Sequence, residues 1–374
     1  MATKVLIAGD FCPQNRVAES FQERAFSPVL GEVKTIISEV DYSIVNFECP
    51  VIMGGERPIT KQGPNLKCSE VGVEAVKWIG FDCVTLANNH FLDYGEEGAN
   101  NTIEACTKYE IDTVGGGMNL AEASKVLYKD LDGIVLAIIN CCEHEFSIAT
   151  ETSAGSNPLN PIKQYYAIQE AKKNADKILV IIHGGHEHFQ LPSPRMVETY
   201  RFFIDAGADA VVNHHQHCFS GYELYKGKPI FYGLGNFCFD KPQFRDNIWN
   251  YGYMVIIDFT SDNTPKLIPY KQCCEKPSVS LLVNQSDFEV QIEKLNIIIS
   301  DKNQLEKEIE KYYSKDSRFT RQLFEPYSSR LMVKLYLMHI IPSLLSNKKL
   351  ISILNKIDCE SHRDKLLYFL KQKN

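Results

Sequence analysis

The chain has 374 residues, of which 44% are hydrophobic and 23% are charged, so a soluble globular fold is expected. Its net charge of −7 excludes the broad basic surface that nucleic-acid binding requires. Residues 286–374 hold 16 Lys and Arg against 12 Asp and Glu, a net of +4, which leaves −11 on residues 1–285. The acidic part favours metal cations over polyanions.

The first ten residues, MATKVLIAGD, are typical of a strand rather than of a signal peptide. No apolar run reaches the ~20 residues that span a bilayer. We therefore expect a cytoplasmic protein with no membrane span, whose twelve cysteines stay reduced. No Cys-x-x-Cys motif is present, so the cysteines indicate small core residues rather than a zinc ribbon.

Short runs rich in Val, Ile and Phe alternate with segments of helical periodicity, which predicts an α/β domain. The strand-like runs are KVLIAGD, YSIVNFE, FDCVTLANN, GIVLAIINCCE, KILVIIHGG, ADAVVNHH, KPIFYGLGNF and YGYMVIIDF. From about Ser286 the pattern is helical throughout, so we expect a main domain over 1–285 and a C-terminal helical extension over 286–374. The apolar faces of the extension should pack away from the site, either on the main domain or on a second subunit, and the second alternative would make the protein a homo-oligomer.

Polar residues follow six of the predicted strands, where ligands bind in open α/β sheets. These residues are Asp10, Glu48, Asn88, Asn89, His90, His183, His186, Glu187, His188, His214, His215, His217 and Asn236. Singly, each could be a turn former, a helix cap or a hydrogen-bonded core residue. Together they predict one site around a cation, because buried carboxylates and imidazoles are costly unless they are paired or metal-bound.

The two histidine clusters, HGGHEH and NHHQH, should be two walls of that site. Each follows an apolar run, KILVII or ADAVV, and the helix-like segment PRMVETYRFFIDAG joins the two runs. This arrangement is a βαβ unit, whose strands are parallel. Both clusters are therefore expected at the same edge of the sheet.

Seven motifs occur in order along the chain: AGD, NFECP, KQGPNLKCS, LANNHFLDYG, HGGHEH, NHHQH and FYGLGNFCFD. On these motifs, residues 4–260 resemble the CapA family, which is associated with poly-γ-glutamate capsule production and belongs to the calcineurin-like metallophosphoesterase superfamily. The resemblance implies a four-layer α/β/β/α sandwich with a metal pair between the strand ends. The C-terminal helical extension lies outside it.

The resemblance also implies roles for particular residues. The implied metal ligands are Asp10, Glu48, Asn89, His183, His215 and His217. His90, next to Asn89, corresponds to a proton donor, and Asp93 either orients it or caps a helix. Glu187 and Asn236 correspond to family residues and are candidate substrate contacts. Lys61 and Asn65, in the Gly- and Pro-containing loop TKQGPNLK, are further candidate contacts for an anionic substrate. Lys61 could equally be a solvated loop lysine.

Two positions depart from the superfamily pattern. Cys12 stands where the first motif, Asp-x-His, has its histidine, and Glu48 is one methylene longer than the usual bridging aspartate. The site is therefore expected to hold either one divalent ion or two. Its mixture of imidazole, carboxylate and amide ligands favours manganese, iron or zinc over calcium.

The expected function is that of a metal-dependent hydrolase acting on a phosphoester or a γ-glutamyl-type amide, linked to poly-γ-glutamate or another capsular polymer. Its expected partner is an anionic small molecule or polymer. The alternative is a metal-binding accessory protein, without turnover, in the synthesis or export of an anionic polymer. A plain carbohydrate- or nucleotide-binding α/β protein is disfavoured because VGGGMN, residues 114–119, lacks the Gly-Lys-Ser/Thr of a phosphate-binding loop.

Overall fold

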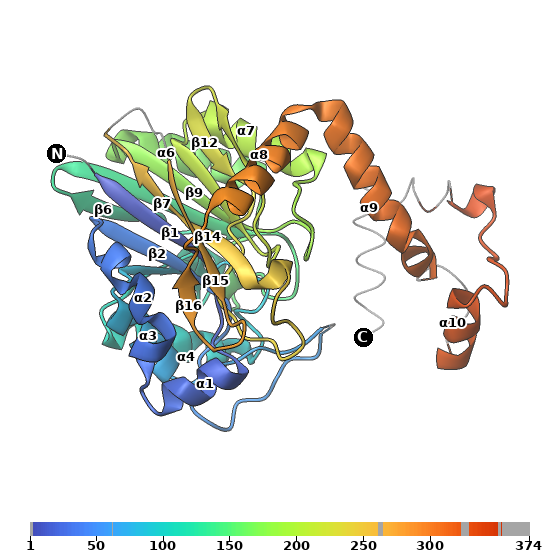
Figure 1. Cartoon of the computed structure of the whole chain (residues 1–374), viewed down its shortest axis with the longest axis horizontal. Helices are drawn as coiled ribbons and strands as arrows, with labels where there is room; N and C mark the ends of the chain where they lie inside the picture. The colour runs from blue at the N-terminus through green and yellow to red at the C-terminus, as the bar shows by residue number, and fades with distance from the viewer. Residues whose placement is uncertain (1–2, 62, 261–264, 323–328, 351–352, 354–374) are drawn as a thin grey trace. The chain divides into compact units, whose positions relative to one another are not determined.

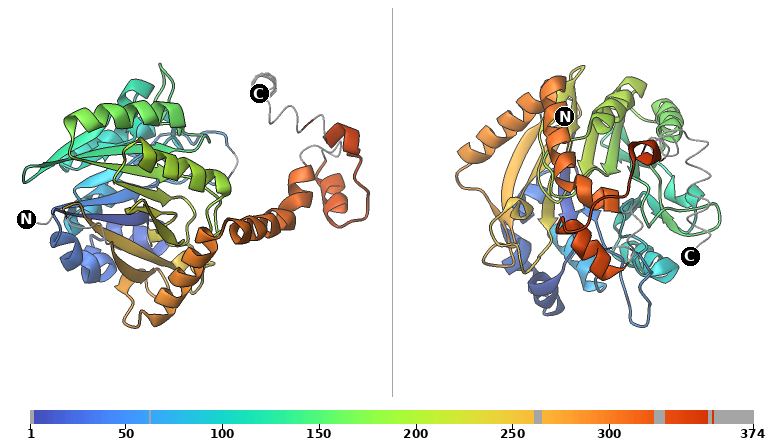
Figure 2. Two further views of the ribbon diagram at one scale, coloured as in Figure 1. Left: turned by 90° about the horizontal axis from the view of Figure 1, so that it is seen from above. Right: turned by 90° about the vertical axis from the view of Figure 1, so that its right-hand side faces the viewer.

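A computed structural model describes residues 3–61, 63–260, 265–322, 329–350 and 353, with the backbone alone over 313–322. The chain divides into two compact units, Met1–Leu305 and Glu306–Asn374. The first unit holds two large β-sheets that lie face to face, with helices on both outer sides (Figure 1; Figure 2, left). This is the α/β/β/α sandwich that was expected, so the predicted fold class is confirmed.

The first sheet has eight strands, and its centre is parallel. In spatial order its strands are β16 (Val279–Leu281), β15 (Lys266–Gln272), β14 (Tyr251–Asp258), β1 (Lys4–Phe11), β2 (Tyr42–Phe47), β3 (Cys83–Thr85) and β4 (Asp112–Val114), with β13 (Asn236–Cys238) also paired to β1. Strands β1 to β4 and β13 run parallel, whereas β14, β15 and β16 are antiparallel. The carboxyl ends of β1, β2, β3 and β13 therefore meet at one edge.

The second sheet has six strands. In spatial order they are β11 (Tyr222–Tyr225), β12 (Lys228–Phe231), β10 (Ala210–His214), β9 (Lys177–His183), β7 (Ile134–Cys142) and β6 (Leu127–Leu131). Its four central strands are parallel, as the predicted βαβ unit requires, and α7 (Pro194–Ala206) connects β9 to β10. A small ladder joins β5 (Gly116–Gly117) to β8 (Gly155–Ser156).

Alternating side chains of β1 explain the layering, because successive residues of a strand face opposite sides of a sheet. Leu6 and Ala8 pack into the cluster beneath the first group of helices. Val5 and Ile7 pack between the sheets, with residues of β9 and β10 such as Leu179. The first group of helices is α1 (Asn15–Gln22), α2 (Phe26–Ser38), α3 (Val71–Ile79) and α4 (Gly95–Lys108). The second sheet is covered by α6 (Pro161–Asn174) and α7.

The helix α8 (Ser286–Ser300) packs on the first unit, although it follows residue 285, where the main domain was expected to end. The ring of Phe288 lies 5.3 Å from that of Phe219 and 5.7 Å from that of Tyr253. The backbone N–H of Tyr222 donates to Asn296 Oδ1 over 2.7 Å. The division by contacts falls after Leu305, and the boundary at residue 285 stays a prediction that truncation can test.

The second unit contains most of α9 (Lys302–Gln322) and all of α10 (Arg330–Leu337). In the described part of the chain, no helix is both long enough and apolar enough to cross a membrane. The eleven described cysteines are free thiols, and all of them except Cys274 are buried. They are accordingly core residues, as their spacing indicated.

Candidate metal centre

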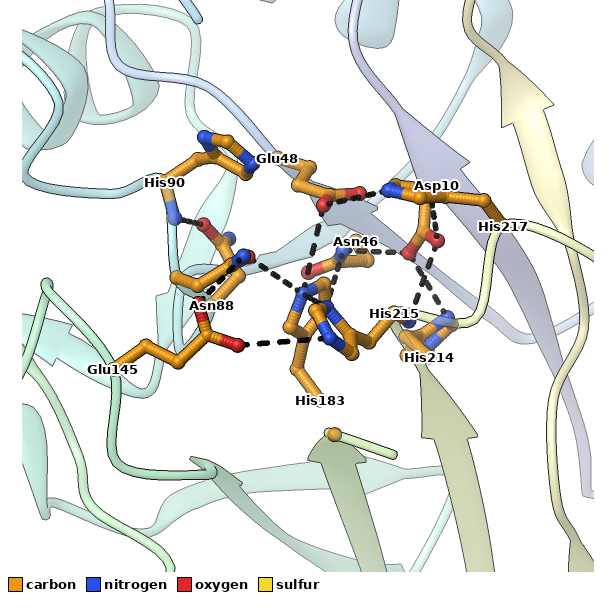
Figure 3. A network of polar contacts seen from close by, with 12 residues as sticks. Asp10, Asn46, Glu48, Asn88, His90, Glu145, His183, His214, His215 and His217 are labelled. Atoms are coloured by element: carbon orange, nitrogen blue, oxygen red, sulfur yellow. Dashed lines mark hydrogen bonds and ion pairs between the residues drawn. The ribbon is translucent and has the colours of Figure 1, made fainter. Parts of the chain in front are cut away.

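The predicted metal ligands lie together at the carboxyl ends of the strands, between the two sheets (Figure 3). Strand register brings them there: Asp10 pairs with Asn46 of β2 and with Asn236 of β13, and His214 pairs with His183 of the neighbouring strand β9. The two histidine clusters therefore belong to one site, as the βαβ unit predicted. The residues of this site are almost entirely buried.

Two groups of side chains could each hold a cation, and Glu48 belongs to both. One group is Glu48, His183 and His215, and the other is Asp10, Glu48 and His217; within each, the ligand atoms lie within 4.8 Å of one another. Glu48 Oε1 lies 3.5 Å from His183 Nε2 and 3.7 Å from His217 Nε2. A carboxylate between two ligand groups is the arrangement that bridges a pair of metal ions.

Asn89 belongs to the first of these groups. Its Oδ1 lies 3.0 Å from His183 Nε2, and His215 Nδ1 lies 3.1 Å from the same nitrogen. Its Nδ2 donates to Glu145 Oε2 over 3.2 Å, and Glu145 Oε1 lies 3.7 Å from His215 Nε2. Glu145 is thus a third carboxylate at the centre. It lies three residues beyond the end of β7, a strand end at which no site residue was predicted.

The surroundings of Glu48 fit a cation. The residue is fully buried, and neither carboxylate oxygen has a hydrogen-bond partner in the described part of the protein. Burial raises the pKa of Glu48 well above its ordinary value, and the negative charge of Asp10 raises it further. A buried carboxylate with no partner is strongly unfavourable, and a bound divalent ion would neutralise it.

The imidazoles are held in the state that binds metals. Burial, followed by the positive charge that His215 can carry, lowers the pKa of His183 well below its ordinary value. Burial also lowers the pKa of His215. Both rings are therefore neutral near pH 7 and offer nitrogen lone pairs. The backbone φ angles of His215 and His217 are +92° and +55°, a left-handed conformation that is costly for residues other than glycine and is often found at functional sites.

Two buried asparagines orient the ligands. Asn46 Nδ2 donates to Asp10 Oδ1 over 2.7 Å and lies 3.3 Å from His183 Nδ1, while Asn46 Oδ1 accepts from Thr85. Asn236 Oδ1 lies 2.9 Å from His217 Nδ1, and its amide donates to the carbonyls of His217 and Trp249. These contacts turn the ligand atoms toward Glu48, as outer-shell partners do in metal sites. Asn236 was predicted to contact the substrate, but in the structure both its amide oxygen and its amide nitrogen contact other residues of the protein.

Two other residues beside the ligands do not belong to either group. His214 is buried, its Nδ1 lies 3.5 Å from Asp10 Oδ1, and neither ring nitrogen has a hydrogen bond in the described residues. Cys12, which replaces the histidine of the first motif, lies in the core cluster beneath the helices, and Gln14 Nε2 contacts its Sγ at 3.4 Å. Burial raises the pKa of the Cys12 thiol, so it stays protonated and is a poor ligand.

A second polar group adjoins the centre. His90 Nδ1 lies 2.6 Å from Asp93 Oδ2, and the Lys61 ammonium forms an ion pair with Asp93. Burial lowers the pKa of His90, whereas the hydrogen bond to Asp93 opposes the decrease. Asn65 donates to the backbone carbonyls of Ile59 and Asp93. Lys61 and Asn65 thus hold Asp93 and its loop, and Lys61 is a buried ion-pair partner rather than a solvated lysine.

The remaining candidate, Glu187, lies at the mouth of the site with its side chain about half exposed. Its Oε2 is 3.9 Å from His188 Nε2, and the charges of His217 and His215 lower its pKa despite partial burial. The ring of His188 lies 5.5 Å from that of Trp249. Glu187 is therefore a carboxylate on the rim, near but outside the two ligand groups.

The sequence of this chain matches the model of a bacterial protein family. The model of the bacterial capsule synthesis protein PGA_cap matches residues 4–241, and the chain belongs to this family. It is 35% identical to the capsule biosynthesis protein CapA of Bacillus anthracis over 243 residues, which are 63% of this chain and 59% of that protein. It is 32% identical to the PGA biosynthesis protein CapA of Bacillus subtilis strain 168 over 236 residues, or 62% of each chain.

The chain thus spans about three fifths of the length of these curated relatives. Among solved structures, a phosphatase from Mycoplasma pneumoniae aligns with 74% of this chain and 95% of its own, with a TM-score of 0.45 and 14% identity.

Proposed function

We propose that this protein is a metal-dependent hydrolase of anionic substrates, acting on a phosphoester or on a γ-glutamyl-type amide in the metabolism of a capsular polymer. The observation that carries the proposal is the Glu48 carboxylate, which is buried, has no hydrogen-bond partner in the described parts of the chain, and is shared by two ligand groups. The residues that would hold the metal are Asp10, Glu48, Asn89, His183, His215 and His217. When bound, divalent manganese, iron or zinc supplies Lewis acidity and an acidified water.

The protein's own residues divide the remaining work. His90 Nδ1 lies 2.6 Å from Asp93 Oδ2, so Nε2 is the ring nitrogen left to exchange a proton with a reacting group, and it donates that proton to a leaving group from the doubly protonated ring. The ion pair with Lys61 holds the Asp93 carboxylate in position. Asn46 and Asn236 hold the ligand rings in place, which limits reorganisation during the reaction.

The capsule-biosynthesis names of the relatives also suit a second function, that of a metal-binding accessory protein without turnover. The His90–Asp93–Lys61 group favours the hydrolase, since a buried, oriented proton donor beside the ligands has no evident use in metal binding alone. Both functions predict metal binding. Only the hydrolase predicts that His90 matters for turnover.

The test is hydrolysis by the manganese-loaded protein of p-nitrophenyl phosphate, bis-p-nitrophenyl phosphate and γ-linked polyglutamate. His90→Asn should lower kcat by roughly 10²-fold or more while keeping the metal content, because it removes the proton donor only. The exposed His144→Asn, in the neighbouring loop, is the matched control and should keep full activity. Full metal occupancy with no turnover of any of these substrates would favour the accessory function instead.

A further inference from the structure

Lys241 lies beside the metal centre, just after β13, and is half-buried. Its ammonium nitrogen is 3.8 Å from the centroid of the Trp249 ring, with the rings of Phe239 and Phe244 at 5.7 and 5.9 Å. The Trp249 ring in turn lies 4.6 Å from that of the ligand His217. One aromatic ring therefore separates this ammonium from the ligand group of Asp10, Glu48 and His217.

The main chain at this position is clamped. The buried carboxylate of Asp240 accepts hydrogen bonds from Arg16 at 2.9 and 3.0 Å and from Arg245 at 2.9 Å. Arg245 also donates to the Lys241 carbonyl over 2.6 Å, and Asn15 donates to the Asp240 carbonyl over 2.8 Å. The position of Lys241 is thus set by contacts on both sides of its peptide group, and its side chain rests on Trp249.

Among the described residues, the ammonium of Lys241 has no carboxylate counter-ion. Other cations around the centre are paired: Lys61 with Asp93, and both Arg16 and Arg245 with Asp240. No described carboxylate lies within 4.0 Å of the Lys241 ammonium. Burial lowers its pKa, and the more distant carboxylates of Glu187 and Glu48 oppose that decrease. A partly desolvated, rigidly placed cation of this kind is suited to an anion from outside the protein.

We propose that Lys241 binds an oxyanion of the substrate, a carboxylate or a phosphate, that is distinct from the group reacting at the metal centre. This inference rests on the proposed function and narrows its substrate class. The substrate would carry a phosphoester or amide that reacts at the metal centre and a separate carboxylate or phosphate that binds Lys241, as successive units of an anionic polymer do. The Trp249 face beneath the ammonium favours its charged form.

Trp249 provides the readout. The chain has two tryptophans, so Trp78→Phe leaves Trp249 as the only one, and its fluorescence reports on an anion at Lys241. In this background, the manganese-loaded protein is titrated with γ-linked triglutamate and, separately, with inorganic phosphate. Lys241→Met should weaken binding of one probe about tenfold, and Lys241→Arg should restore it, because the lost interaction is a charge-assisted hydrogen bond. If Lys241→Met weakens binding of triglutamate only, the group bound at Lys241 is a carboxylate. If it weakens binding of inorganic phosphate only, that group is a phosphate.

Lys34, on α2, offers a control for the loss of a lysine that rests on an aromatic ring, because its ammonium lies 3.7 Å from the ring at position 78, which remains aromatic in the Trp78→Phe background. Lys34→Met should leave both affinities unchanged. Thermal unfolding and metal content of each variant separate lost binding from lost folding. Equal affinities of the Lys241→Met and parent proteins for both probes would overturn the proposal. That outcome is distinct from failure of the proposed function, since binding is read without turnover.

Discussion

Replacing Glu48 by Gln should stabilise the metal-free protein while abolishing its response to metal. Glu48 is fully buried without hydrogen-bond partners in the described residues, and burial raises its pKa well above the ordinary value of 4.5. At pH 7, which is 2.5 pH units higher, keeping such a carboxyl protonated costs about 3 kcal/mol at most. Glutamine has the same shape without the charge, so the metal-free variant should recover part of that free energy.

The assay is thermal unfolding after exhaustive chelation, repeated with excess manganese. For a chain of this size, 1 kcal/mol corresponds to roughly 2 °C, so Glu48→Gln should raise the metal-free Tm by up to about 6 °C. Manganese should raise the Tm of the wild-type protein and leave that of the variant unchanged. Glu187→Gln is the control, because this half-exposed rim carboxylate should alter neither value appreciably. A metal-free Glu48→Gln protein that is no more stable than the wild type would refute the reasoning.

Three further predictions follow from the same contacts. In the metal-free Glu48→Gln variant, the free energy of unfolding should decrease as the pH drops below 6.5, the ordinary pKa of histidine, because only the unfolded chain then protonates His183 and His215. The decrease should reach up to about 1.4 kcal/mol per pH unit for each of the two histidines. An unfolding free energy that stays constant between pH 7 and 5 would contradict this. Asn46→Leu should weaken manganese affinity by roughly 10- to 100-fold in equilibrium dialysis, since Asp10 and His183 lose their orienting amide, and unchanged affinity would contradict that role. A chain ended at residue 285 should be less stable to urea than one ended at residue 305, because it exposes the surface that Phe288 covers, and equal stability would show that α8 is dispensable.

The metal-centre residues at the strand ends could be predicted from the sequence because each of them directly follows an apolar run. Asp10, His183 and His215 are conspicuous for this reason, and parallel strand pairing then brings them to one edge. The layered fold could be predicted from the same runs. The locations of these residues therefore depend on patterns that are local in sequence.

Other parts depend on contacts between distant segments, which leave no local pattern. Asn46 is a single polar residue inside a buried strand, and Glu145 and Lys241 lie in loops whose paths are set by tertiary packing. The ion pair between Lys61 and Asp93 joins residues 32 positions apart, so the sequence alone could not separate a buried lysine from a solvated one. Phe288 shares the helical pattern of the extension, yet it is buried against the first unit.

The central claim is that two cation positions share Glu48. Anomalous diffraction at the manganese edge, from crystals of the manganese-loaded protein, tests it most directly. The claim predicts two peaks on either side of the Glu48 carboxylate, about 3.5–4 Å apart, one beside Asp10 and His217 and the other beside His183 and His215. Manganese peaks only at other residues, with none at Glu48, would contradict it.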